Sequence, residues 1–402
     1  MAASYPVDPD EKADFATLVR NAGFQLEAYH ATTEDGYILT IHRIVPKGHS
    51  VAHDVAYTKA RKPVLIFHGL SSSADNFFLT SHGWSGRNAS SKCGDNIAYC
   101  LVESGHYDVW LGNNRGNGYS MKHTKLNTSQ AEFWHFSMDQ ISKYDLPTTI
   151  DLVLNKTGHK QIGYIGHSQG CAIMFGLLSE HPEKYSEIIQ PFIAWAPGVY
   201  IHNVKSNSFR VIESFSSYYL NLGNELNLMD VLGKNFDCHV SPDDKDNQCL
   251  YFLYDFAGPT THNNLTRLPV YLRFFPAPTS MWSYVHYGQI QVKDRFVKFD
   301  YGSAEKNRAV YGVDHPPEYQ LTKINPKTKV VIMWGETDNL IAPKDIEHLH
   351  SVLKPVLKDS LINYRVPSKE FNHFDFAIAQ DAGPLVYDKT LEYLNEFTVK
   401  NH

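Results

Sequence analysis

The chain has 402 residues, of which 43% are hydrophobic and 13% aromatic, so it can bury a large core together with an inserted segment. A disordered or fibrous protein is therefore excluded. The formal net charge of -6 comes from interspersed charges without a long basic block, which argues against a nucleic-acid partner. No stretch approaches the roughly 20 consecutive apolar residues that span a bilayer, so no transmembrane segment is expected.

Strands and helices are predicted to alternate along the first half of the chain. The segments Gln25–His30 and Tyr37–Ile44 flank the turn signal Thr33-Glu34-Asp35-Gly36 and predict a hairpin. Short apolar runs then predict buried strands, and amphipathic runs predict helices. In chain order these are a strand over 63–67, a helix over 95–104, a strand over 107–111, a helix over 140–156, a strand over 161–165 and a helix over 171–178. The alternation predicts an α/β fold with a mostly parallel sheet flanked by helices.

The alternation is lost from about Val199 to Leu321. This segment is rich in aromatic residues and proline, as in Phe274-Phe275-Pro276-Ala277-Pro278, and we interpret it as an inserted, mainly helical cap. Strands over 329–334 and 361–366 and a closing helix over 385–399 restore the pattern. The predicted organisation is a core made of residues 1–198 and 322–402, with a cap and lid at 199–321.

The clearest chemical signal is Gly166-His167-Ser168-Gln169-Gly170, which lies between a predicted strand and a predicted apolar helix. In this setting G-x-S-x-G is typical of the nucleophile elbow of the α/β-hydrolase fold, a turn so tight that only small residues fit beside the serine. Ser168 is therefore the candidate nucleophile, against the alternative of an ordinary surface serine.

A catalytic serine needs a base within hydrogen-bond reach and a carboxylate that fixes the tautomer of that base. In this fold the chain order is serine, acid, histidine. The loop after the strand over 329–334 offers two carboxylates; its spacing favours Asp338, with Glu336 as the alternative. His373 is the candidate base because it falls in a predicted loop, whereas His348 and His350, the other histidines between the acid and the terminus, fall in a predicted polar helix.

The tetrahedral intermediate of ester hydrolysis needs two backbone N–H donors. The elbow offers the N–H of Gln169, and the loop after the strand over 63–67 offers that of Leu70. No metal-binding motif and no glycine-rich phosphate loop is present, so neither a metal nor another cofactor is expected.

The five cysteines fall into two groups. Cys93, Cys100 and Cys171 lie in apolar surroundings and are expected to be buried free thiols. Cys238 and Cys249 bracket a polar, acidic loop that a disulfide would hold in place, and two reduced thiols are the alternative.

Four sequons and the first residues of the chain bear on its location. The candidate glycosylation sites are Asn88, Asn127, Asn155 and Asn264. The first residues lack the features of a secretory signal. We therefore expect a cytoplasmic protein if Met1 is the native start, and a secreted or lysosomal one if the chain is a processed form.

Several motifs taken together are highly specific. They are His68-Gly69-Leu70, Asn113-Asn114-Arg115-Gly116-Asn117, Lys143-Tyr144-Asp145-Leu146-Pro147, Gly166-His167-Ser168-Gln169-Gly170 and Asn372-His373-Phe374-Asp375-Phe376. Over nearly its whole length the chain resembles the acid lipase family of lysosomal and gastric lipases. The resemblance implies the same triad, Ser168, Asp338 and His373, and a cap with a mobile lid and a disulfide placed like Cys238–Cys249. The resemblance leads us to expect a signal peptide, which the first residues do not show, and threonine at the position of Cys171.

The expected function is hydrolysis of carboxylic esters of lipids at a lipid–water interface, through an acyl-enzyme intermediate. A thioesterase or peptidase on the same fold is the alternative. A non-catalytic lipid carrier would need a lost triad member, and none is lost. The apolar residues of the cap that are expected to line an acyl-chain channel are Phe215, Tyr218, Tyr219, Leu226, Met229, Phe252, Phe274, Phe275, Met281 and Trp282.

Overall fold

The computed structural model of the chain describes residues 8, 10–47, 55–80, 91–214, 218, 230–231 and 248–399. A nine-stranded sheet runs through its centre in the order β1-β2-β4-β3-β6-β7-β10-β11, with β5 paired to β2. The strands are β1 Phe24–Thr32, β2 Tyr37–Pro46, β3 Lys62–Phe67, β4 Tyr107–Leu111, β5 Lys122–His123, β6 Ile162–His167, β7 Ile189–Trp195, β10 Val330–Trp334 and β11 Leu361–Arg365. From β4 to β11 every pairing is parallel, whereas β1, β2 and β5 pair antiparallel. The predicted α/β fold and its hairpin are thus confirmed.

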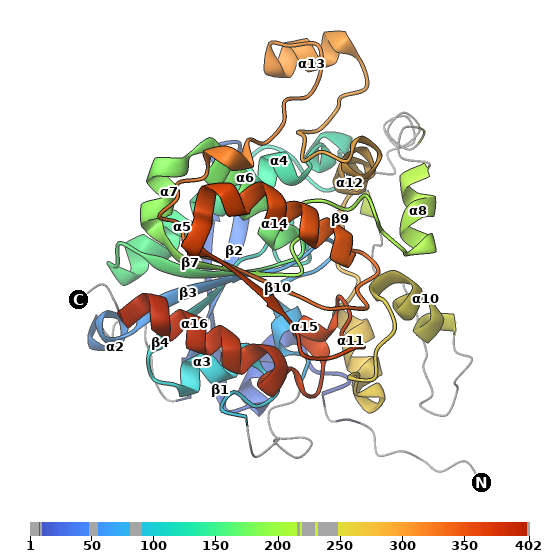
Figure 1. The fold of residues 1–402 in the computed structure, drawn as a ribbon. Coiled ribbons are helices and arrows are strands. Elements are labelled where there is room, and N and C mark those ends of the chain that lie inside the picture. The colour runs from blue at the N-terminus through green and yellow to red at the C-terminus, as the bar shows by residue number, and fades with distance from the viewer. Residues whose placement is uncertain are drawn as a thin grey trace.

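Helices cover both faces of the sheet, with α5, α6, α7 and α14 on one face and α3 and α16 on the other (Figure 1). The helices outside the insertion are α1 Phe15–Asn21, α2 Val55–Ala60, α3 Ile97–Glu103, α4 Met138–Gln140, α5 Leu146–Thr157, α6 Gln169–Glu180, α7 Pro182–Ile188, α14 Pro343–Leu357, α15 Asp375–Ile378 and α16 Asp388–Val399. Short 3-10 turns are η2 Ala74–Phe78, η3 Ala131–Trp134, η6 Leu321–Lys323 and η7 Lys358–Ser360, and π-turns are η4 Ile141–Asp145 and η8 Gly383–Tyr387. Because the central strands are covered on both faces, they read as continuous apolar runs in the sequence.

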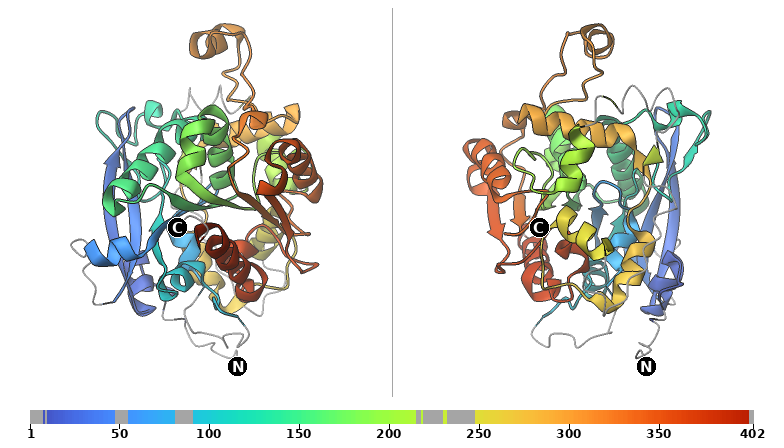
Figure 2. Two further views of the ribbon diagram at one scale, coloured as in Figure 1. Left: turned by 60° about the vertical axis from the view of Figure 1, so that its left-hand side comes forward. Right: turned by 90° about the vertical axis from the view of Figure 1, so that its right-hand side faces the viewer.

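The described part of the insertion between β7 and β10 adds no strand to the large sheet. Its elements are α8 Asn207–Ser214, β8 Asp230–Val231, α10 Gln248–Ala257, η5 Leu265–Arg267, α11 Leu268–Phe274, β9 Thr279–Ser280, α12 Met281–Lys293 and α13 Ala304–Tyr311. Helices α8, α10, α11 and α12 gather on one side of the molecule, which faces the viewer in the right-hand view of Figure 2. In the described residues, no helix is both long and apolar enough to cross a membrane.

The long helix predicted over 140–156 is interrupted by the π-turn η4. Pro147 lies in the first turn of α5 and has no N–H to donate. The π-turn directly before it therefore does not deprive Pro147 of a helical hydrogen bond. The turn ends at Asp145, whose carboxylate holds Arg115 at 2.6 Å, and Arg115 also contacts Asp35 of the hairpin turn at 2.6 Å. The ion pair between Arg115 and Asp145 is buried and joins the motifs at 113–117 and 143–147.

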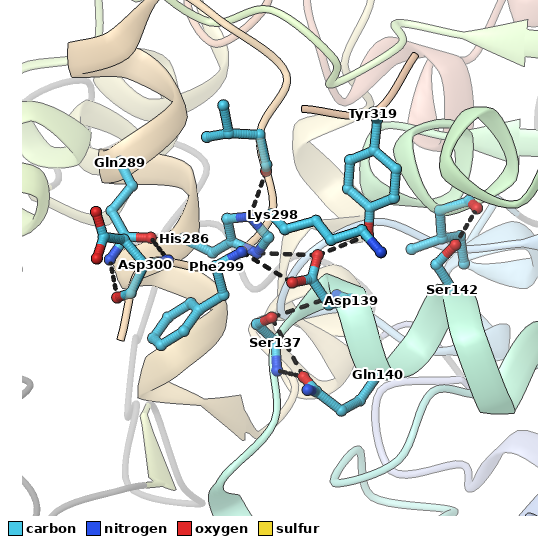
Figure 3. Close-up of polar contacts among 12 residues, drawn as sticks. Ser137, Asp139, Gln140, Ser142, His286, Gln289, Lys298, Phe299, Asp300 and Tyr319 are labelled. Carbon is cyan, nitrogen blue, oxygen red and sulfur yellow. Dashed lines mark hydrogen bonds and ion pairs between the residues drawn. The ribbon is translucent and has the colours of Figure 1, made fainter. Parts of the chain in front are cut away.

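A buried polar network fastens the C-terminal part of the insertion to the core (Figure 3). The carboxylate of Asp139 in α4 accepts a hydrogen bond of 2.6 Å from the Tyr319 hydroxyl and one of 2.8 Å from the Phe299 N–H. His286 of α12 lies beside it, 3.9 Å from the same carboxylate, and donates from Nε2 to the carbonyl of Val297 at 2.8 Å. The buried Asp139 charge is therefore satisfied by groups from the insertion.

The cysteine predictions are corrected in one respect. Cys93 and Cys100 are not free thiols: a disulfide joins them, with their Cα atoms 4.7 Å apart. Cys93 lies in the loop before α3 and Cys100 in its first turns, so the chain reversal at the start of the helix brings together residues that look like separate core positions in the sequence. Cys171 is a buried free thiol, as predicted. The predicted pair Cys238–Cys249 involves a position outside the described residues.

Candidate active site

The candidate nucleophile lies where the central strand β6 ends and α6 begins. Ser168 has a φ of 55°, a left-handed conformation that is costly for a residue with a side chain, and it is 9% exposed. A Cβ on Gly166 would come within 2.8 Å of the Gly170 carbonyl carbon, and a Cβ on Gly170 within 2.4 Å of the Phe67 carbonyl oxygen. The packing that the motif predicts is therefore present at both glycines.

Asp338 and His373 meet at the carboxyl ends of two neighbouring strands. Asp338 follows β10 and His373 follows β11, and the His373 Nδ1 lies 2.7 Å from the Asp338 Oδ2. The other carboxylate oxygen, Oδ1, accepts hydrogen bonds from the N–H groups of Leu340 at 2.8 Å and Ile341 at 2.7 Å. Both side chains are almost completely buried. The carboxylate is thus held by the backbone on one side and orients the imidazole on the other.

The alternative acid lies elsewhere. Glu336 pairs with Arg365 at 2.9 Å, and both side chains are exposed. His348 and His350 lie in α14, as their polar helical pattern predicts, where the His348 ring stacks on Tyr200 with centroids 4.0 Å apart.

The loop that carries His373 is fastened from three sides, which sequence reasoning did not foresee. The His373 N–H donates to the Ala257 carbonyl of the insertion at 3.2 Å, and His167 donates from Nε2 to the His373 carbonyl at 2.9 Å. Asn372 donates from its amide to the Gly258 carbonyl at 2.7 Å, and Asp375 accepts from the Asn372 N–H at 2.7 Å. The polar residues on either side of the histidine in the motif 372–376 are the feature of the sequence that could have indicated these contacts.

Burial keeps His167 neutral for this task. Burial, aided by the neighbouring His373, lowers the pKa of His167 to about 3. The residue in front of the serine therefore acts as a fixed donor rather than as a titrating group near neutral pH.

The loop after β3 is pressed against the serine. A Cβ on Gly69 would lie 3.0 Å from the Ser168 Cβ, so a side chain at this position would force the loop or the serine to shift. The N–H of Asn114 donates to the His68 Nε2 at 3.1 Å, and the His68 Nδ1 therefore donates to the Gly69 carbonyl at 2.8 Å. Burial lowers the pKa of His68 to about 4, which favours this neutral form. Leu70, the predicted second oxyanion donor, lines the same pocket as Ser168.

Ser168 and His373 line one pocket. Its walls are mainly apolar and come from the insertion and from the loops after the strands, as in Ile201, Val204, Phe209, Phe256, Phe275 and Leu340. The Tyr287 hydroxyl of α12 also lines the pocket and is buried without a hydrogen-bond partner in the described structure. Among the described residues, no cluster of three or more histidine, cysteine or carboxylate side chains is arranged to hold a metal ion.

Only one of the described cap residues proposed for the channel, Phe275, lines this pocket. Met281 and Trp282 instead pack inside the insertion around Phe299, and Tyr218 is 61% exposed. Phe252 and Phe274 pack against the main core. Phe215, Tyr219, Leu226 and Met229, as well as the sequon at Asn88, lie outside the described residues. Of the other sequons, Asn127 and Asn155 are exposed and Asn264 is half-buried.

The mostly parallel sheet and the serine turn at its centre define an α/β-hydrolase. The model of the partial α/β-hydrolase lipase region matches residues 15–81, and that of the α/β-hydrolase fold matches residues 62–189. Two solved structures share the fold at 13–14% identity: a candidate lipase from Sulfolobus solfataricus (TM-score 0.52; 93% of this chain, 95% of that one) and an epoxide hydrolase variant from Bacillus megaterium (TM-score 0.50; 92% and 100%).

Curated relatives align over almost the whole chain. Lipase 1 of Drosophila melanogaster is 33% identical over 97% of this chain and 81% of its own length. Human lipase member K is 32% identical (97% and 92%), and human gastric triacylglycerol lipase is 33% identical (98% and 93%). The chain belongs to the acid lipase family of α/β-hydrolases, and its reaction class is the hydrolysis of carboxylic esters of lipids.

Proposed function

We propose that the chain hydrolyses long-chain lipid esters with Ser168 as nucleophile, His373 as general base and Asp338 as the acid that orients the base. The observation that carries the proposal is the 2.7 Å contact between the His373 Nδ1 and the Asp338 Oδ2, next to a serine in the same apolar pocket. The contact leaves the His373 Nε2 as the atom that exchanges protons with the serine.

The reaction has two halves. His373 takes the proton of Ser168 as the serine oxygen attacks the ester carbonyl, and the C–O bond to the alcohol breaks as His373 returns that proton to the leaving alcohol. Water then attacks the acyl-serine ester by the same proton transfers and releases the fatty acid. In both halves the N–H groups of Leu70 and Gln169 stabilise the oxyanion.

The proposed substrate follows from the lining of the pocket. Apolar walls gain about 0.8 kcal/mol for each methylene that they remove from water, which favours a long acyl chain over a short one. The relatives named as triacylglycerol lipases support an acylglycerol substrate.

The proposed site of action is a lipid–water interface. Val211 of α8, Tyr251 of α10 and Val292 of α12 are between 58% and 74% exposed, and they lie on helices of the insertion, which also lines the pocket. Contiguous exposed apolar patches mark surfaces that contact lipid or another protein, and α8 contacts both α10 and α12. A secreted or lysosomal location is proposed with this function, supported by the disulfide between Cys93 and Cys100.

The test is Ser168→Ala, assayed on a panel of esters and thioesters that vary in acyl length. We expect the variant to lose ester turnover while its thermal unfolding temperature stays within a few degrees of the wild type. Ser179→Ala is the matched control, because Ser179 lies on the same helix and donates to the Gly176 carbonyl at 2.8 Å, away from the pocket. Near wild-type turnover in Ser168→Ala would refute the assignment, and a preference for thioesters would favour the alternative enzyme class.

A further inference from the structure

A buried hydroxyl on the wall of the pocket that contains Ser168 has no acceptor for its proton. Tyr287 of α12 lines this pocket and is 4% exposed, and among the described residues no group forms a hydrogen bond with its hydroxyl. Buried polar groups in proteins are nearly always paired, because an unmet one costs stability. An unpaired hydroxyl on the wall of a substrate pocket is therefore expected to bind the substrate.

Tyr287 lies beside the candidate nucleophile. A Cβ on Gly198 would lie 3.2 Å from the Tyr287 hydroxyl oxygen and 3.4 Å from the Ser168 carbonyl oxygen, so both residues border the space beside this glycine. The Gly198 N–H also donates to the Ser168 carbonyl at 3.2 Å. The Tyr287 hydroxyl is therefore close enough to contact an ester that is bound at Ser168.

The neighbouring residues of α12 hold Tyr287 in place. Tyr284, three residues earlier, faces the same side of the helix, and its hydroxyl forms a hydrogen bond of 2.7 Å with the Ser71 Oγ. His286, the residue before Tyr287, donates from Nε2 to the Val297 carbonyl at 2.8 Å. The position of the Tyr287 hydroxyl is thus set before a substrate binds, which lowers the entropic cost of the contact.

The hydroxyl has a proton to donate. Burial raises the pKa of Tyr287, so the hydroxyl stays protonated near neutral pH. The Gln169 amide lies beside it but outside hydrogen-bond geometry, and the amide nitrogen is itself buried without an acceptor in the described part of the chain. An amide nitrogen could not accept the hydroxyl proton in any case. The bound ester therefore has to supply the acceptor.

The chemistry of the ester narrows the choice of acceptor. The N–H groups of Leu70 and Gln169 are the proposed donors to the carbonyl oxygen, and His373 is the proposed donor to the oxygen of the leaving alcohol. A hydrocarbon acyl chain carries no further oxygen. The oxygens that remain are those of the alcohol part, which glycerol esters have and esters of simple alcohols lack. We propose that the Tyr287 hydroxyl donates a hydrogen bond to such an oxygen and so selects glycerol esters over esters of simple alcohols; this inference rests on the proposed function.

The experiment compares kcat/KM for two soluble esters that differ only in the hydroxyl groups of their alcohol part, 1-butyrylglycerol and n-propyl butyrate. Tyr287→Phe removes the hydroxyl and keeps the ring. The variant should lose about fivefold on 1-butyrylglycerol, the worth of one hydrogen bond between neutral groups, and stay within about twofold of the wild type on propyl butyrate. It should unfold at the temperature of the wild type or above, since the free protein loses no hydrogen bond within the described structure.

Tyr284→Phe is the matched control, because it makes the same change on the same helix at a hydroxyl that already has a partner. This variant should unfold at a lower temperature and keep the wild-type ratio of kcat/KM between the two esters. The inference is overturned if Tyr287→Phe keeps that ratio, whether or not its activity falls, or if it unfolds well below the wild type. Failure of the proposed function looks different: the wild type would then hydrolyse neither ester, or Ser168→Ala would remain active on both.

Discussion

Asp338→Asn tests the candidate triad most sharply, because the structure dictates how the new amide must lie. The Oδ1 of Asp338 accepts from the N–H groups of Leu340 and Ile341, so the asparagine oxygen has to take that position. The opposite orientation would place an NH2 group against two N–H donors in a buried site, at a cost of about 1–3 kcal/mol for each unmet group. The NH2 group therefore faces the Nδ1 of His373.

A donor at that position reverses the histidine tautomer. The His373 Nδ1 then has to accept, its proton moves to Nε2, and the atom facing Ser168 can no longer take the serine proton. In serine triads this change costs about 10⁴-fold in kcat, which corresponds to about 5.4 kcal/mol at the transition state. The fold should be nearly unaffected because the substitution keeps the shape of the side chain.

The assay compares kcat on a short soluble ester for the wild type, Asp338→Asn and the matched variant Glu336→Gln, with the thermal unfolding temperature of each. Glu336→Gln should keep full activity because Glu336 pairs with Arg365 at the surface. A large loss in Glu336→Gln, or a loss below tenfold in a folded Asp338→Asn, would refute the reasoning.

Three further outcomes are expected. Burial raises the pKa of Asp75 from 3.8 to about 6. The folded state therefore has its full stability below pH 3.8, where Asp75 is protonated, and loses part of it as the pH rises through 6 and the buried carboxyl ionises. Asp75→Asn should therefore gain about 3 kcal/mol in unfolding free energy over the wild type between pH 4 and pH 8, measured by urea unfolding; an unchanged difference would contradict the assignment. Gly170→Ala should lose activity and unfold several degrees lower, since its Cβ would lie 2.4 Å from a backbone oxygen of β3, whereas Gly118→Ala, with no atom within 4 Å, should match the wild type. Cys100→Ser should lower the unfolding free energy by about 2–3 kcal/mol, and a reductant should destabilise the wild type but not this variant; equal sensitivity would argue against the bond to Cys93.

The sequence predicted the features that depend on local pattern. Buried strands such as β3 and β6 are continuous apolar runs, and the elbow is a short motif with a steric reason, so both could be located without a structure. The acid–histidine pair could be predicted as well, since the fold sets its chain order and the loop positions narrow the choice to Asp338 and His373.

Features that depend on distant contacts could not be predicted. The donation from His167 to the His373 carbonyl joins positions 206 residues apart, and nothing in the local pattern indicates it. For the same reason, the prediction that the aromatic residues of the insertion line an acyl-chain channel was wrong for most of the described ones. Phe275 reaches the pocket whereas Trp282 stacks on Phe299 with ring centroids 4.9 Å apart, yet both lie in similar aromatic and proline-rich surroundings.

The network around Asp139 limits how this chain can be rebuilt with the cap of another protein. Tyr319, which bonds to Asp139, also packs on the serine-bearing helix: a Cβ on Gly176 would come within 3.2 Å of its ring. Ser142, just beyond Asp139, donates to the Ile173 carbonyl of that helix at 2.8 Å. A cap transplanted from a relative would therefore have to bring its own partner for Asp139 and fit the surface of α6. In this chain the end of the insertion and the core are therefore joined by specific contacts, and an exchanged cap would have to reproduce them.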